Sequence, residues 1–86
     1  MDCFSLIVLD NTLELATQTL KAKHVTDDIK VIRGYMDLIV VDPSNQEYAQ
    51  KLQEAVTDLS EIAKENQQSM ILARLETIAR DLGNFR

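Results

Sequence analysis

Residues 42–62 of the chain read DPSNQEYAQKLQEAVTDLSEI, and their pattern sets the architecture of what precedes and follows. Pro43 cannot continue a helix but suits the first turn of one, and Ser44 with Glu47 has the spacing of a capping box. Apolar residues then recur every three or four positions, at Tyr48, Leu52, Ala55/Val56, Leu59 and Ile62. This is the period of an α-helix, so the stretch predicts a helix over about residues 45–64 with one apolar face.

Two further apolar stripes precede Pro43. They consist of Leu6, Leu9, Leu13, Ala16 and Leu20, and of Val25, Ile29, Ile32, Met36 and Ile39. They predict helices over about residues 5–23 and 27–41, with Thr26 as the N-cap of the second, because cations precede it and acids follow it. Residues 3–9 could instead form a strand or a docking tail, because Asn11 and Glu14 also have capping-box spacing.

The second of these segments carries more apolar surface than one stripe needs. Val31, Leu38, Val40 and Val41 all lie off its stripe. Residues 38–41 are apolar on every side of a helix, so we expect them to be largely buried. Gly34 lies inside the same helix, at a cost of about 1 kcal/mol relative to alanine.

The stripe of the third segment stops at residues 64–69, which are polar throughout. It resumes one position early, about 100° around the helix, at Leu72, Leu75, Ala79 and Leu82. Residues 45–82 are therefore either one long helix with a twisted seam or two helices. We favour a turn near residues 66–69 and a fourth helix over about 70–82, although a polar layer that fixes helix register would give the same pattern.

Together the stripes predict an all-α protein. We expect a single domain of residues 1–86, folded as a three- or four-helix antiparallel bundle, with homodimerisation as a way to complete it. Gly83 is expected to cap the last helix, with Phe85 folding back on it.

The composition excludes several classes of protein. Two glycines and one proline are too few for the turns of a β-sandwich or β-barrel. A single cysteine excludes an internal disulfide framework and a multi-cysteine zinc site. Nine basic and 14 acidic residues give a net charge of −5, which argues against nucleic-acid binding. No apolar run reaches the length of a membrane span and no secretory signal is recognisable, so we expect a cytoplasmic protein.

No pattern predicts catalysis or a bound cofactor. His24, Asp27 and Asp28 could share a helix face, but a metal site needs a second contributing element, and capping explains these residues. Cys3 lacks the cationic neighbour that a reactive thiolate needs. The paired carboxylates of residues 54–65 lie on a polar face rather than in an apolar pocket. We therefore expect no enzyme, cofactor, metal ion or small-molecule substrate.

Protein binding is the function that these patterns favour. The stripes exceed what one short bundle needs, so we predict a non-catalytic interaction module such as a small adaptor, regulator, chaperone or inhibitor. Its expected partner is a basic protein or a second copy of the chain. The expected contact residues are an aliphatic seam of Leu52, Val56, Leu59 and Ile62 and an acidic face of Glu54, Asp58 and Glu61.

Several short segments resemble the needle-subunit family of bacterial type III secretion systems. They are Asp42-Pro43-Ser44-Asn45, the terminal Asn84-Phe85-Arg86, Thr17-Gln18-Thr19-Leu20 and Gln68-Ser69. Needle subunits are two helices joined by a Pro-Ser-Asn-Pro type turn, and Gln46 stands where the second proline would be. The resemblance implies a self-assembling structural subunit as the alternative function, with its C-terminal helix lining the lumen of a polymer. Small helical chaperones of the same secretion systems share this general pattern.

Overall fold

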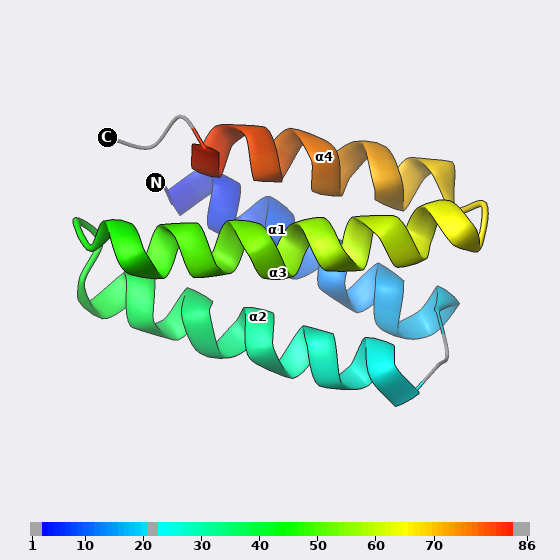
Figure 1. The fold of residues 1–86 in the computed structure, drawn as a ribbon, viewed down its shortest axis with the longest axis horizontal. Helices are drawn as coiled ribbons and strands as arrows, with labels where there is room; N and C mark the ends of the chain where they lie inside the picture. Colours follow the sequence, from blue (N-terminus) through cyan, green and yellow to red (C-terminus); the bar gives the residue numbers. More distant parts are fainter. Residues whose placement is uncertain (1–2, 21–22, 84–86) are drawn as a thin grey trace.

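The computed structural model describes residues 3–20 and 23–83, which form an all-α bundle. The helices within these residues are α1 (Cys3–Thr19), α2 (Lys23–Val41), α3 (Gln46–Glu65) and α4 (Ser69–Gly83). Figure 1 shows that each helix runs antiparallel to the one before it. The predicted fold class is therefore confirmed, with the fourth helix present and residues 3–9 helical.

Each helix packs against two neighbours. α3 packs against α2 and α4, and α1 packs against the same two helices from the opposite side, so α1 lies diagonally across from α3. The contact between α3 and α4 is the most extensive, whereas α1 packs least tightly against its neighbours. The core between them is aliphatic, and its largest fully buried side chains are Leu9, Leu13, Val25, Ile32, Leu52, Val56, Leu59, Ile71 and Leu75.

Asn45 is the N-cap of α3. Its backbone is extended, and its side-chain Oδ1 accepts hydrogen bonds from the N–H groups of Glu47 (3.0 Å) and Tyr48 (3.3 Å). The predicted cap at Ser44 is therefore wrong by one residue, and the Ser44 hydroxyl lies 3.4 Å from the carboxylate of Asp42 instead. An asparagine satisfies two free N–H groups of the first turn here, which is the purpose of an N-cap.

α2 begins at Lys23, four positions before the start expected from a cap at Thr26. Val25 explains the difference, because it is 1% exposed and is the first member of the buried stripe on α2. Val25 lines up with the rest of this stripe only if it is part of the helix. Packing of the apolar stripe thus prevails over the local preference of threonine for a cap.

The link between α3 and α4 is a tight Schellman turn. The N–H of Gln68 donates to the carbonyl of Ala63 (2.9 Å), and the N–H of Gln67 donates to that of Lys64 (3.1 Å). Gln67 adopts a φ of 59°, the left-handed conformation that this motif requires and that glycine usually supplies. The polar run thus forms a turn, as we favoured, and not a layer inside a long helix.

The buried face of α4 is rotated from the predicted one. Ile71 and Ile78 are buried together with Leu75 and Leu82, whereas Leu72 and Ala79 are half-buried at the edge. The larger isoleucines fill the core and leave the smaller alanine at its border. Because the apolar stripe of α4 is wider than its buried face, the sequence alone does not decide which of its residues are buried.

Gly83 ends α4 without the left-handed conformation expected of a glycine cap, since no described glycine has a positive φ. Its lack of a side chain serves a close approach instead. A Cβ atom at Gly83 would lie 2.5 Å from Nε2 of Gln53, which donates to the carbonyl of Ala79 at 2.8 Å. Phe85 lies outside the described residues, so its predicted contact stays a prediction.

Candidate interaction surfaces

The predicted aliphatic seam lies inside the bundle. Leu52, Val56 and Leu59 are fully buried against the chain's own helices, and Ile62 is half-buried at the edge of the core. Leu52, Val56 and Leu59 therefore hold the fold together and present no surface to a partner, whereas Ile62 stays partly exposed. An apolar stripe has the same period whether its own chain or another one covers it, so the sequence alone did not separate these cases.

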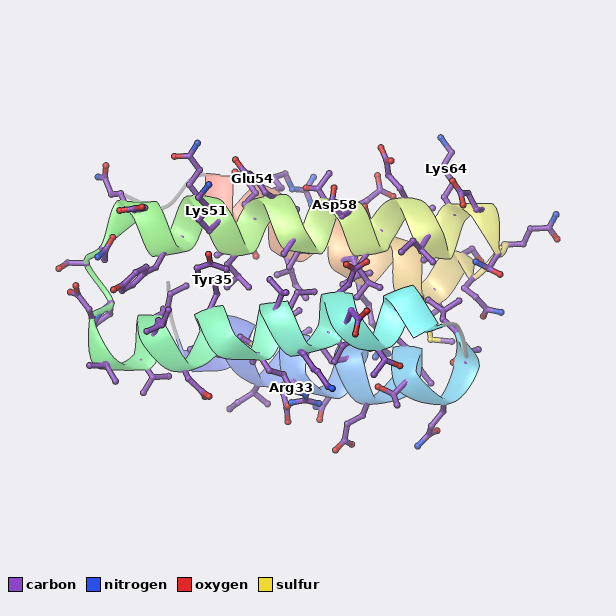
Figure 2. All side chains as sticks on the ribbon, turned by 60° about the horizontal axis from the view of Figure 1, so that its bottom comes forward. Arg33, Tyr35, Lys51, Glu54, Asp58 and Lys64 are labelled. Carbon is purple, nitrogen blue, oxygen red and sulfur yellow. The ribbon has the colours of Figure 1, made fainter. Side chains whose placement is uncertain are left out.

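The predicted acidic face is on the surface, as expected for charged residues. Glu54, Asp58 and Glu61 are all exposed. In Figure 2, Glu54 and Asp58 project from the side of α3 that faces away from α2. Lys51 lies on the same helix, with its Nζ 3.9 Å from Oε2 of Glu54, so part of the negative charge is balanced locally.

A polar groove runs beside this face, between α3 and α4. Its lining consists of Thr57, Ser60, Glu61, Lys64, Glu65, Leu72 and Glu76. Three of these side chains carry a carboxylate and one an ammonium group, so the groove is acidic. The Ser60 hydroxyl, which is buried, donates to the carbonyl of Thr57 at 2.6 Å and does not point into the groove as a free donor.

Among the described residues, four of the exposed large apolar side chains lie on α2, namely Val31, Leu38, Val40 and Val41. We call Val31, Gly34, Leu38 and Val41 the α2 outer face. Val31 is 49%, Leu38 42% and Val41 85% exposed. The spacing of three or four residues places these four positions on one side of the helix, opposite the buried Val25, Ile32 and Ile39.

The expectation that residues 38–41 are largely buried is wrong for three of the four. Only Ile39 is buried (2% exposed), and Val40 is 66% exposed. Four consecutive residues surround a helix, and a single bundle covers only the side that faces its core. Burial of the others would need a second layer of protein, which the described part of this chain does not supply.

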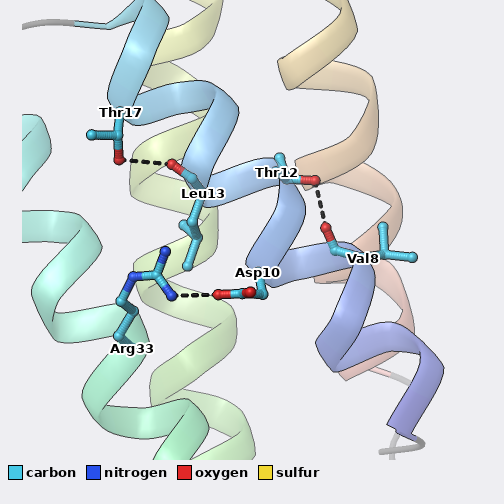
Figure 3. Close-up of polar contacts among 6 residues, drawn as sticks. All are labelled: Val8, Asp10, Thr12, Leu13, Thr17 and Arg33. Carbon is cyan, nitrogen blue, oxygen red and sulfur yellow. Dashed lines mark hydrogen bonds and ion pairs between the residues drawn. The ribbon is translucent and has the colours of Figure 1, made fainter.

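The two edges of the α2 outer face differ in chemistry. Tyr35 borders it on the side of α3, where Figure 2 shows its ring between the two helices. Arg33 projects toward α1 instead, where its guanidinium donates to the carboxylate of Asp10 (Figure 3). Lys30 and Asp37 are exposed on this second, charged edge. The outer face thus has an apolar flank and a charged flank.

Two threonine hydroxyls of α1, one buried and one exposed, donate to the backbone. Thr12 is fully buried and donates to the carbonyl of Val8 at 2.7 Å, and the more exposed Thr17 donates to that of Leu13 at 2.8 Å (Figure 3). Each bond returns to the preceding turn of α1, so these groups belong to the fold.

The weak metal and nucleophile candidates gain no support. The side chains of Cys3 and His24 lie outside the described part of the structure, and Asp27 is exposed. Among the described residues, no three acidic, histidine or cysteine side chains converge on a point that could hold a metal ion. None of the helices as described has both the length and the apolar character needed to cross a membrane.

No protein-family model, curated protein or solved structure matches this chain.

Proposed function

We propose that this chain is a non-catalytic protein–protein interaction module that docks through the α2 outer face. The acidic face of α3 is a separate surface that would attract a basic partner. This retains the class of function expected from the sequence and moves the apolar contact from the buried seam of α3 to the exposed side of α2.

The exposure of Val31, Leu38 and Val41 carries this proposal. Transfer of such side chains from water to an interface is favourable by about 25 cal/mol per Å² of apolar surface. The depression at the centre of the face is lined by Val31, Gly34, Tyr35 and Leu38, all from one helix. A shallow surface of this kind fits another helix better than it fits a small molecule, which needs an enclosing cavity.

The acidic face is suited to speeding the arrival of a partner and contributes little to the affinity of the complex. Glu54, Asp58 and Glu61 are exposed to solvent, where a single ion pair contributes little to affinity. A surface of one sign of charge nevertheless raises the rate at which an oppositely charged partner arrives. We therefore expect its neutralisation to slow association and to leave dissociation nearly unchanged.

Photocrosslinking inside cells tests the docking surface. A benzoylphenylalanine residue in place of Leu38 should give discrete adducts of defined mass. The same probe in place of Ala73, an exposed residue outside the acidic groove on the helix diagonally across from α2, is the control. If position 38 yields no more adducts than position 73, the α2 outer face is not a docking surface.

A self-assembling subunit remains the alternative function. The exposed apolar side of α2 is compatible with it, because open polymers also need an exposed surface that another copy can cover. Polymers use two different surfaces on each copy and grow without limit, whereas a docking module forms complexes of fixed size. The mass of the assembled protein across a concentration series separates these two functions.

A further inference from the structure

We propose that the α2 outer face is the interface of an antiparallel, two-fold symmetric homodimer in which two α2 helices cross at Gly34. This inference rests on the proposed docking function and assigns the α2 outer face to a second copy of the chain, so a basic partner would contact the acidic face of α3 and not α2. It leaves the acidic face of α3 free on both copies.

Gly34 is the first observation. Glycine weakens a helix interior, and this glycine is exposed at the middle of α2. A Cβ atom there would meet no atom within 4 Å, so nothing in the described chain requires its absence. A close approach of another helix does require it, because two backbones can come together only where side chains are small.

The second observation is the charged flank, whose Lys30 and Asp37 can pair with the same two residues of a second copy. Lys30 lies four residues before Gly34 and Asp37 three residues after it. With a rise of 1.5 Å per residue, they stand about 6 Å and about 4.5 Å from the crossing point, in opposite directions along the helix. At 3.6 residues per turn, both lie on the same side of Gly34 around the helix axis. Lys30 is rotated from Gly34 by about 40° and Asp37 by about 60°.

An antiparallel pair brings these two charges together. A two-fold axis through the crossing point places Lys30 of one copy opposite Asp37 of the other, and the reverse contact follows from the symmetry. Two equivalent ion pairs then close the charged side of the interface. Like charges opposite each other would disfavour the contact, so this pattern selects a second copy of the chain as a partner.

The apolar flank obeys the same symmetry. Val31 stands about 4.5 Å before Gly34 and Leu38 about 6 Å after it, both on the side of Tyr35. The antiparallel pair therefore sets Val31 of one copy against Leu38 of the other. A parallel pair would instead turn the charged flank of each copy toward the apolar flank of its partner. Asp27 and Val41 each lie about 10.5 Å from the crossing point, where crossed helices diverge, so neither side chain is covered by the partner helix and the carboxylate keeps its water.

Charge reversal with rescue tests the arrangement. Sedimentation velocity on the purified full chain, from 1 µM to 1 mM, measures the dimer dissociation constant. We expect Lys30→Glu and Asp37→Lys each to raise this constant at least tenfold, since each places like charges opposite one another twice. The double variant keeps the net charge of −5 and should return within about threefold of the original value. Arg74→Glu, on α4 diagonally across from α2, is the control for a change of charge alone.

The outcomes distinguish this inference from the function on which it rests. A chain that is monomeric at 1 mM, that forms open polymers, or whose double variant stays dissociated overturns the antiparallel dimer. In each of these cases, crosslinks from position 38 to another protein would still support docking through α2. Circular dichroism of each variant checks that the bundle is intact, which we expect because all three substituted residues are exposed.

Discussion

The side-chain amide of Gln53 on α3 occupies the space that a Cβ atom of Gly83 on α4 would need. That atom would lie 2.5 Å from Nε2, which donates to the carbonyl of Ala79 at 2.8 Å. The last turn of α4 is thereby attached to the middle of α3 by a polar contact that depends on a missing side chain.

Gly83→Ala is expected to lower the free energy of unfolding by about 0.5–1 kcal/mol. The methyl group displaces the Gln53 amide and breaks its hydrogen bond, which costs more than the better helix propensity of alanine returns at a helix end. Urea unfolding measures the change. In a Gln53→Ala background the same substitution should no longer destabilise, and a loss that persists there would contradict this explanation.

Gly34→Ala is expected to stabilise the folded chain and to weaken the association of two copies. The new methyl group meets no atom of its own chain, so the helix should gain about 0.5–1 kcal/mol in unfolding free energy. The same methyl group would separate the two backbones at the proposed crossing point and weaken the dimer. Unfolding should be followed at low micromolar concentration, so that dissociation does not add to the measured stability. A dimer that is strengthened by this substitution would contradict a close approach at Gly34.

Gln67→Gly is expected to raise the free energy of unfolding by about 0.5–1 kcal/mol. A residue with a side chain pays about 1 kcal/mol in the left-handed conformation that Gln67 adopts, and glycine pays none of it. Thermal unfolding compares this variant with Gln68→Gly, whose backbone lacks the positive φ and should gain nothing. Equal effects at both positions would show that the turn is not strained at Gln67.

Leu59→Ala should destabilise the protein far more than Glu61→Gln, because the first residue faces the core and the second faces solvent. Leu59 is fully buried, so its truncation should cost about 2–5 kcal/mol of stability. Glu61 is exposed, and its neutralisation should change stability by less than about 0.5 kcal/mol. Chemical denaturation of both variants measures this contrast. A small effect of Leu59→Ala would contradict the placement of the seam in the core.

The helical stripes could be read from the sequence because amphipathic packing has a fixed period. Leu9, Leu13 and Leu52 are buried as their spacing predicts. Helix ends were harder, because several local signals compete there. Asn45 caps α3 although Ser44 had the expected spacing, and Val25 draws α2 past Thr26. The first difference is a choice between two adjacent local caps, whereas the second comes from the burial of Val25, a tertiary contact that a local pattern does not contain.

The exposure of the α2 outer face could not be predicted from the sequence for a different reason. We expected Leu38 to be buried and Leu59 to contact a partner, yet the first is 42% exposed and the second is buried. Which stripe faces the core depends on how the helices are placed around one another. The charges of Glu54 and Asp58 gave a more direct signal, because carboxylates are almost never buried without a partner.

The sparse packing of α1 has a consequence for how the bundle opens. α3 and α4 are neighbours in sequence and share the most extensive contact, whereas α1 contacts α2 and α4 only lightly. Its link to α2 includes the Asp10–Arg33 ion pair, which is nearly half exposed and thus contributes little. Amide hydrogens of α1 should therefore exchange with solvent through a sub-global opening that costs less free energy than unfolding of the whole chain. We expect α2, α3 and α4 to stay packed together during that opening, while α1 separates from them.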